Sequence, residues 1–333
     1  MTPLLVKIQL EPGAEFSDAR GLPLVALAGP TGSGKSDLAI ELALEFGGEI
    51  VNCDSLQVYR HFDIGSAKLP IAERRGVPHH LIDILNPDQI FTAGDYARVA
   101  REAIAEIASR GKLPIVAGGT GFYLRALVDG LFEGPSRDQK LRERLASREA
   151  RRRGSIHRLL ARFDPTTAAR IHPNDVPKVT RALEVYLLAR RPASELFKEG
   201  RDALRGFHTL KMGLLPDREA LNARLDARCK RMFEEGLVDE VKGIIDFGYQ
   251  PSVKPFESLG YKQALQQVQG ELSPRDAVFY AQRTTRQYAK RQLTWFRREP
   301  GLRWLRGFGD DPGIRAEARQ YTQNFLKEFQ PSS

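Results

Sequence analysis

Residues 29–36 read G-P-T-G-S-G-K-S, and this stretch decides the fold. It has the form G-x-x-x-x-G-K-[ST]. It follows the apolar run 24–28, and apolar residues at helical spacing continue from it to residue 46. A strand, a glycine-rich loop and a helix in this order form a phosphate-binding loop, because glycines let backbone N–H groups close around phosphate oxygens at the positive end of a helix. We expect Lys35 to reach the outer phosphates and the Ser36 hydroxyl to bind Mg²⁺. The motif predicts a polyphosphate ligand without specifying ATP.

Alternating strand and helix patterns extend to about residue 132. Residues 49–53 predict a second strand, residues 94–110 a helix, and residues 113–117 a third buried strand. Such alternation is typical of a parallel sheet with helices on both faces. Ligands bind outside the carboxyl ends of the strands in such sheets, so the functional residues are expected there.

Asp54 and Thr120 each follow a predicted strand, as the loop 29–36 does, so we expect all three at one edge of the sheet. From its position, Asp54 has three interpretations: a ligand of Mg²⁺, a general base, or a cap of the next helix. Thr120 follows the glycines 118–119 and either belongs to a tight turn or binds a sugar, a phosphate or a base. Gln57 either recognises a base edge or lies exposed on the surface.

The sequence changes character after about residue 134. Charged, helix-forming stretches dominate to about residue 200, residues 207–215 predict a strand that returns to the sheet, and residues 217–296 are mainly helical. The predicted fold class is α/β, a phosphate-loop parallel sheet flanked by helices, with a helical insertion domain and a helical C-terminal part. The predicted domains are an N-terminal extension at 1–21, a core at 22–133 and 206–310, a helical insertion at 134–205, and a polar tail at 311–333.

Composition narrows the class of protein. The chain has 333 residues, is 41% hydrophobic, and contains only two cysteines, Cys53 and Cys229, far apart in the sequence. That usage predicts no disulfide framework and no zinc module. No apolar run approaches the ~20 residues of a membrane span, and acidic residues interrupt residues 1–22, so we expect neither membrane binding nor a signal peptide. The sequence predicts a cytoplasmic protein, and we expect a monomer.

The net charge of +9 suggests an anionic partner larger than one nucleotide, although solubility alone would also explain it. Residues 283–298 carry six basic side chains and no acidic one, and Arg286 and Lys290 would share one stripe of a helix. Residues 136–158 are also rich in arginine. Each region alone could be a solvated helix face. Two such regions in one chain favour a polyanionic partner such as RNA, because binding to it releases counterions.

Arg224 and Arg228 lie four residues apart and would share one helix face. They form either a surface ion-pair network with Glu219 and Asp226 or a guanidinium fork on a diphosphate. The adjacent histidines at 79–80 have no third metal ligand nearby in the sequence, which favours a structural role.

Six motifs in a fixed order resemble those of the bacterial tRNA dimethylallyltransferases, also called tRNA isopentenyltransferases. After G-P-T-G-S-G-K-S come D-S-L-Q-V-Y with D-I-G-S-A-K, G-G-T-G-F-Y, I-H-P-N-D-V-P-K-V-T-R-A-L-E-V, E-S-L-G-Y-K-Q, and T-R-Q-Y-A-K-R-Q-L-T-W-F-R. The resemblance runs from about Leu22 to Trp304. It implies transfer of a dimethylallyl group from dimethylallyl diphosphate to N6 of the adenine 3′-adjacent to the anticodon in tRNA, with release of diphosphate.

The resemblance also implies roles for individual residues. Lys35, Ser36 with Mg²⁺, and Arg228 would neutralise the leaving diphosphate. Asp54 would accept the proton from the attacking amine, and Thr120 would help to position the tRNA. The implied diphosphate-binding residues are Gly29, Pro30, Thr31, Gly32, Ser33, Gly34, Lys35 and Ser36. The implied tRNA-binding residues are Asp54, Ser55, Leu56, Gln57, Thr120, Pro177, Lys178, Val179, Thr180, Arg181, Glu257, Gly260, Lys262, Arg286 and Lys290.

Two other functions compete with prenyl transfer. A phosphate-loop kinase acting on a nucleotide or small molecule would use Lys35 and Ser36, but it leaves the two basic regions unexplained. An RNA-binding protein gated by a nucleotide would account for the charge and the loop. It gives no reason for Asp54 and Thr120 to meet at the strand ends.

Overall fold

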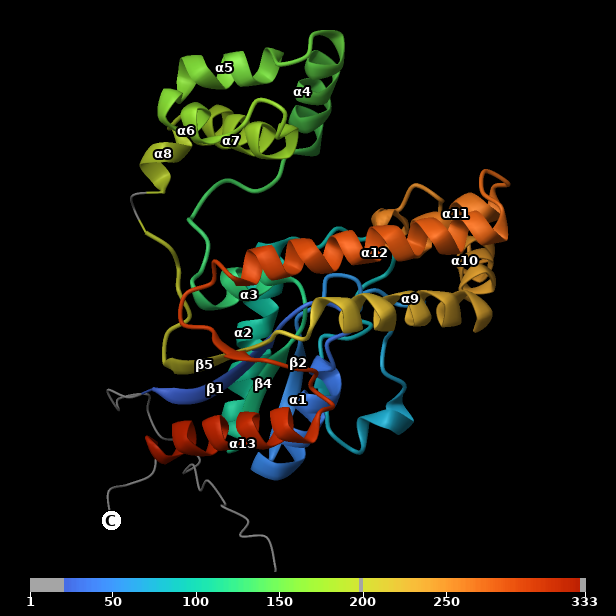
Figure 1. The fold of residues 1–333 in the computed structure, drawn as a ribbon. Coiled ribbons are helices and arrows are strands. Elements are labelled where there is room, and N and C mark those ends of the chain that lie inside the picture. The colour runs from blue at the N-terminus through green and yellow to red at the C-terminus, as the bar shows by residue number, and fades with distance from the viewer. Residues whose placement is uncertain (1–20, 198–199, 330–333) are drawn as a thin grey trace, which may run out of the picture. The chain divides into compact units, whose positions relative to one another are not determined.

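The computed structural model describes residues 21–197 and 200–329, and the chain divides into two compact units (Figure 1). The core unit joins the chain up to Val128 with the chain from Leu204 onward, and the insertion unit is Asp129–Ala203. The sequence predicted the insertion at 134–205.

The core unit is built on a parallel sheet with the strand order β3-β2-β4-β1-β5-β6. Its central strand β1 is almost entirely buried, as its apolar sequence LPLVALA requires for a strand covered on both faces. The strands are β1 (Leu22–Ala28), β2 (Gly48–Asn52), β3 (His79–His80), β4 (Leu113–Ala117), β5 (Phe207–Leu214) and β6 (Arg303–Leu305).

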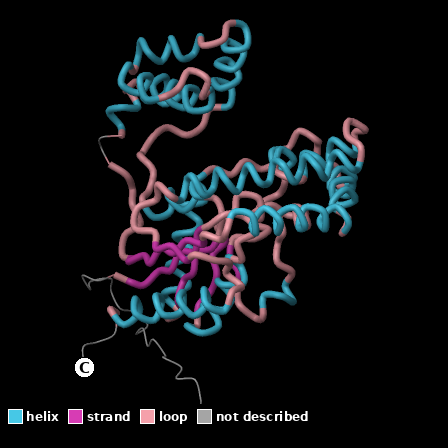
Figure 2. The backbone as a smooth tube through the Cα atoms, viewed as in Figure 1, coloured by secondary structure: helices cyan, strands magenta, loops and turns pink. Residues whose placement is uncertain are grey.

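Helices cover both faces of this sheet, as Figure 2 shows. One face carries α1 (Lys35–Phe46) and α13 (Pro312–Lys327), whose apolar residues share one core with β1, β4 and β5. The other face carries α2 (Ala93–Ser109) and α3 (Gly121–Val128). A capping box starts α2, because the Thr92 hydroxyl accepts from the backbone N–H of Asp95, and the Asp95 carboxylate accepts from that of Thr92. The fold class predicted from the sequence is confirmed.

A helical layer follows β5 in the chain. Helices α9 and α12 pack side by side, and α10 and α11 pack together beyond them (Figure 1). Their bounds are α9 (Arg218–Glu234), α10 (Leu237–Asp246), the 3₁₀-helix η2 (Lys254–Glu257), α11 (Tyr261–Val268) and α12 (Pro274–Phe296). A second 3₁₀-helix, η1 (Ile71–Arg74), precedes β3. Among the described helices, none combines the length and apolar character that crossing a lipid bilayer requires.

The insertion unit is helical and has its own apolar core, to which Ile156, Leu160, Val179 and Leu183 belong. The carboxylate of Glu184 is also fully buried, and Arg142 and Arg181 both pair with it. Its helices are α4 (Gln139–Arg151), α5 (Ser155–Phe163), α6 (Pro165–Arg170), α7 (Val176–Ala189) and α8 (Ala193–Leu196).

Three elements differ from the sequence-based expectations. The short edge strands β3 and β6 were not predicted. The stretch predicted as a polar tail at 311–333 instead contains α13, in which Ile314, Ala318 and Phe325 form a buried stripe against the sheet. Most residues of this helix are polar and face away from the sheet. Composition alone therefore does not reveal the apolar stripe.

Candidate active site

The loop between β1 and α1 has the geometry of a phosphate cradle. Gly32 and Gly34 have φ values of 77° and 83°, a left-handed conformation that glycine adopts without steric cost. A Cβ on Gly34 would lie 2.9 Å from the backbone nitrogen of Gly309. The Nζ of Lys35 donates to the carbonyl of Pro30 at 2.7 Å, which curls the side chain back over the loop. With α1 beginning at Lys35, its first N–H groups are available to an anion.

This loop lines a cavity of about 740 Å³ in the core unit, together with the chain that follows β2 and β4 and with α9. Lys35, Asp54 and Arg228 are among the lining residues. Burial lowers the pKa of Lys35 to about 8, with Asp54 raising it and Arg228 lowering it further. Burial also lowers the pKa of Arg228. Two cations that are desolvated beside one carboxylate gain from a bound polyanion, so the cavity suits a diphosphate.

Arg224 and Arg228 lie one turn apart on α9 but have different surroundings. Arg224 pairs with Asp310 at 2.9 Å, and its guanidinium lies 4.9 Å from the ring centroid of Phe308. Within the described chain, no carboxylate forms an ion pair with Arg228, which lines the cavity. The partners Glu219 and Asp226, which the surface interpretation gave to these arginines, are not used. Both arginines line the first cavity, and Arg228 is the one that forms no ion pair with a carboxylate of the described chain.

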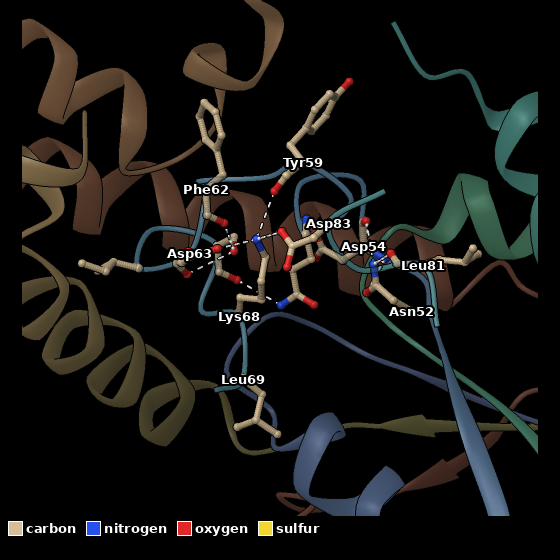
Figure 3. A network of polar contacts seen from close by, with 12 residues as sticks. Asn52, Asp54, Tyr59, Phe62, Asp63, Lys68, Leu69, Leu81 and Asp83 are labelled. Atoms are coloured by element: carbon tan, nitrogen blue, oxygen red, sulfur yellow. Dashed lines mark hydrogen bonds and ion pairs between the residues drawn. The ribbon is translucent and has the colours of Figure 1, made fainter. Parts of the chain in front are cut away.

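Asp54 is held in place through one of its two carboxylate oxygens. Its Oδ1 accepts from the backbone N–H groups of Leu56 at 2.8 Å and of Gln57 at 3.4 Å, which caps the turn that follows β2. Its own N–H donates to Asn52 Oδ1 at 3.1 Å, and Asn52 Nδ2 donates to the carbonyl of Leu81 at 3.0 Å (Figure 3). The capping interpretation expected a helix after Asp54, whereas Oδ1 caps a turn and the next helical element is η1. This cap leaves the second oxygen for a ligand or a proton.

Thr120 holds the loop that carries Asp54. Its Oγ1 accepts from the backbone N–H of Ser55 at 3.0 Å, and its own N–H donates to the carbonyl of Cys53 at 3.1 Å. The turn approaches so closely that a Cβ on Gly118 would lie 2.1 Å from the carbonyl oxygen of Cys53. Thr120 and Asp54 thus come together as expected, and the threonine hydroxyl already accepts a hydrogen bond from the protein backbone.

A buried lysine fixes another wall of the cavity. The side chain of Lys68 is 5% exposed, and its Nζ bonds Asp83 Oδ1 at 2.6 Å, Asp63 Oδ1 at 2.5 Å and the carbonyl of Tyr59 at 3.0 Å (Figure 3). Gln57 is half-buried, and its Nε2 donates to the carbonyl of Ser66 at 3.2 Å. Sequence reasoning did not single out Lys68, because its partners lie in separate loops.

A second cavity, of about 340 Å³, adjoins the first in the core unit. Thr31, Asp54 and Arg228 line both spaces. The second cavity has mostly apolar walls, with Tyr288 and Arg291 contributed by α12. Burial raises the pKa of Tyr288 to about 12, so its hydroxyl stays protonated. Asp54 and Arg228 consequently stand where a small anionic ligand and a second, flatter ligand can meet.

The remaining tRNA-binding candidates of the core unit lie in different environments. Glu257 and Lys262 are exposed, whereas Gly260 is buried and its N–H donates to Gln263 Oε1 at 3.1 Å. Gly260 precedes the first residue of α11 and also lines the second cavity, so its role in tRNA binding stays a prediction. Ser55 and Leu56 line the second cavity.

The exposed side of α12 carries part of the predicted basic stripe. Lys290 lines a groove of about 650 Å³ together with Arg291, Trp295 and Arg298. Arg286 instead pairs with Asp226 on α9, so it connects two helices. Basic side chains beside an aromatic ring are typical of a surface that binds nucleic acid.

The insertion unit corrects part of the predicted stretch Pro177 to Arg181. Pro177 and Lys178 are exposed, and Lys178 pairs with Asp175. Thr180 is half-buried. Val179 is fully buried in the helical core, so its side chain packs and does not face a ligand. Arg181 pairs with the buried Glu184 and donates to the carbonyl of Pro135, but its side chain is 35% exposed, so its contact with tRNA stays a prediction.

The donor set around Ser36 was tested for the expected Mg²⁺. Ser36 is exposed in the first cavity, and the described residues contain no group of three His, Cys, Asp or Glu side chains able to hold a metal. A lone hydroxyl fits Mg²⁺, which keeps waters and takes its remaining ligands from substrate phosphates. His79 and His80 form β3, and His80 bonds Glu49 at 2.7 Å.

Fold and site together define a class: an α/β protein with a phosphate-loop motif, a cavity lined by Lys35, Arg228 and the carboxylate of Asp54, and a basic outer helix. A family model described as IPP transferase matches residues 57–299. The chain belongs to the tRNA dimethylallyltransferase family, as its motifs predicted, and thereby to the prenyltransferases.

Relatives and solved structures agree with this assignment. A tRNA dimethylallyltransferase of Solibacter usitatus is 69% identical over 305 residues, covering 92% of this chain and 99% of that protein. One from Koribacter versatilis is 56% identical over 298 residues, covering 89% and 97%. The full-length tRNA isopentenylpyrophosphate transferase of Bacillus halodurans has a TM-score of 0.69 at 36% identity, covering 92% and 97%. A eukaryotic dimethylallyltransferase acting on tRNA has a TM-score of 0.80 at 31% identity, covering 93% and 80%.

Proposed function

We propose that this enzyme transfers a dimethylallyl group from dimethylallyl diphosphate to N6 of the adenine 3′-adjacent to the anticodon in tRNA, releasing diphosphate. The observation that carries the proposal is the meeting of two cavities at Asp54 and Arg228. One cavity has a phosphate loop and two cations. The other has apolar walls that suit a flat base. Relatives named tRNA dimethylallyltransferases support this pair of substrates.

The transfer step makes specific demands on these residues. A bond forms between adenine N6 and C1 of the dimethylallyl group, the C1–O bond breaks, and its electron pair leaves on the diphosphate. Lys35 and Arg228 stabilise the charge that develops on the leaving oxygens, which lowers the barrier selectively in the transition state. The N6 proton passes to the carboxylate of Asp54, whose Oδ1 is already held by the N–H of Leu56.

The acceptor base must leave its stack to reach Asp54, because N6 is inaccessible inside an ordered anticodon loop. Lys290 and Arg291 on α12, and Arg298 just after it, would bind the flanking phosphates. Mg²⁺, held by the Ser36 hydroxyl with diphosphate oxygens and water, would add positive charge at the leaving group. We expect the enzyme to act as a monomer in the cytoplasm.

The substitution Asp54→Asn tests the proposal. An asparagine oxygen can still accept from the N–H of Leu56, but it cannot take a proton, so we expect prenylation of unmodified tRNA to fall about 10²–10⁴-fold while tRNA still binds. Asp37→Asn is the matched control, because Asp37 is an exposed carboxylate that lines the same cavity. Mass spectrometry of the nucleosides measures transfer, and filter binding measures tRNA affinity.

Near-normal turnover by Asp54→Asn would overturn the general-base role. Incubating the wild-type enzyme and unmodified tRNA with ATP and, in parallel, with dimethylallyl diphosphate separates the kinase alternative from prenyl transfer. Phosphoryl transfer without prenylation would overturn the proposed function itself.

A further inference from the structure

Gln292 on α12 connects two loops of the site through one side-chain amide. Its Oε1 accepts from the backbone N–H of Thr31 at 2.8 Å, and its Nε2 donates to the carbonyl of Gly119 at 2.8 Å. The residue is 6% exposed. Both ends of a buried amide are thus satisfied by backbone groups that belong to different loops.

The two loops carry different parts of the proposed chemistry. Thr31 belongs to the phosphate loop and lines both cavities. Gly119 precedes Thr120, whose hydroxyl holds Ser55 beside the general base Asp54. The amide therefore connects the phosphate loop to the turn that holds the loop of Asp54.

The close approach explains a glycine at position 119. A Cβ there would lie 2.4 Å from Nε2 of Gln292, so any side chain would displace the amide or the turn. Tyr288, one turn earlier on α12, lines the second cavity.

We propose that Gln292 is a positioning residue for prenyl transfer: by bonding Thr31 and Gly119 at once, it fixes the distance between the diphosphate cradle and the general base. It acts through these two backbone groups, and it also lines the first cavity. The inference rests on the proposed function, because an attack on a diphosphate ester needs the phosphate loop and the loop of Asp54 at a fixed distance from each other.

Two substitutions separate the two hydrogen bonds. Gln292→Met keeps the volume and removes both bonds. Gln292→Glu keeps an acceptor for Thr31, but it can donate to Gly119 only when its carboxyl group is protonated. The matched control is Gln282→Met, since Gln282 on the same helix also donates from Nε2 to a backbone carbonyl, that of Asp226, at 3.0 Å.

We expect Gln292→Met to lower kcat about a hundredfold, the effect of shifting reacting groups by about 1 Å, while the Kd for tRNA stays close to that of the wild type. We expect Gln282→Met to keep normal turnover. Activity of Gln292→Glu, taken relative to the wild type, should rise as the pH falls, because protonation restores the donor to Gly119 and burial raises the pKa of a carboxyl group. We expect this rise also at pH values where Gln292→Glu and the wild type are both fully folded, as their Tm values show, and there a merely structural role would give no such pH dependence.

A wild-type kcat in Gln292→Met would overturn the inference. Two other results would also overturn it. One is a loss of turnover and a shift in Tm that both equal those of Gln282→Met. The other is an activity of Gln292→Glu, relative to the wild type, that does not change with pH. The binding of inorganic diphosphate, measured by calorimetry, tests the role of Gln292 separately from the proposed function. If the wild type prenylates no tRNA, the proposed function fails. Gln292→Met should still weaken diphosphate binding, and unchanged binding would count against the cradle role.

Discussion

Arg142 in the insertion unit and Arg228 in the core unit are both partly buried, but only one of them has a carboxylate partner. The guanidinium of Arg142 donates to both oxygens of Glu184, at 2.8 Å from Nε and 2.7 Å from Nη2. Arg228 has no such partner in the chain as described, and it faces a cavity. An arginine whose charge is already matched stabilises the fold. An arginine held beside open space without a carboxylate has its binding capacity left for a ligand.

Glu184→Ala is the substitution with the largest expected effect on the paired arginines of the insertion unit. Hydrogen bonds from Arg142 and Arg181 outweigh the opposing effect of burial and lower the pKa of Glu184 to about 2. Removing the carboxylate leaves two arginines uncompensated, so we expect the insertion unit to lose about 3 kcal/mol, the lower end of the range for breaking a buried pair because both arginines reach solvent. Hydrogen exchange of peptides from α4 and α7 measures the loss.

The control is Lys178→Ala, which breaks an exposed pair on the same helix, and for which we expect well under about 1 kcal/mol. Equal exchange in the two variants would mean that the buried cluster adds nothing to stability.

The comparison is sharpened inside α9 by Arg228→Ala and Arg224→Ala. We expect Arg228→Ala to lower kcat/KM for dimethylallyl diphosphate about 10²-fold, as removal of one charge-stabilising donor does. Arg224→Ala should cost only about twofold to fivefold, because its exposed pair with Asp310 takes up the charge. Steady-state kinetics with varied donor at saturating tRNA decide the point. A reversed order of the two variants would assign the diphosphate to Arg224.

The smallest effect comes from pH. The pKa of Lys35 is lowered to about 8, so the free enzyme loses this charge as the pH rises above 8, and affinity for the donor should fall by up to about tenfold per unit. Measuring the binding of dimethylallyl diphosphate between about pH 7.5 and about pH 9.5 tests whether the affinity falls as the pH rises. Lys35→Arg keeps its charge throughout, so its profile should stay flat. Parallel profiles would exclude Lys35 as the titrating group.

Local sequence patterns predicted the parts of the site that follow strands. The phosphate loop, Asp54 and Thr120 could be found because a parallel sheet brings its strand ends to one edge, whatever the rest of the chain does. Gln292, the Lys68 cluster and the Asp310 partner of Arg224 could not be found. Their partners lie in loops far away in the sequence, and only the packed fold brings them together.

Secondary structure shows the same limit. Strands β3 and β6 are two and three residues long, too short for a periodic pattern. Conversely, Val179 was expected at an RNA surface because it stands in a motif, and the structure buries its side chain in the helical core. A motif marks residues that matter without saying whether they matter for contact or for packing.

The pairing of β1 with β5 also constrains how the chain is made. Leu22 pairs with Phe207 and Ala28 with Gly213, and the whole insertion unit is translated between these two strands. Until the ribosome delivers β5, one side of β1 is a bare edge of the kind that recruits other chains. The nascent enzyme must therefore survive the synthesis of an entire helical unit with its central strand half-paired.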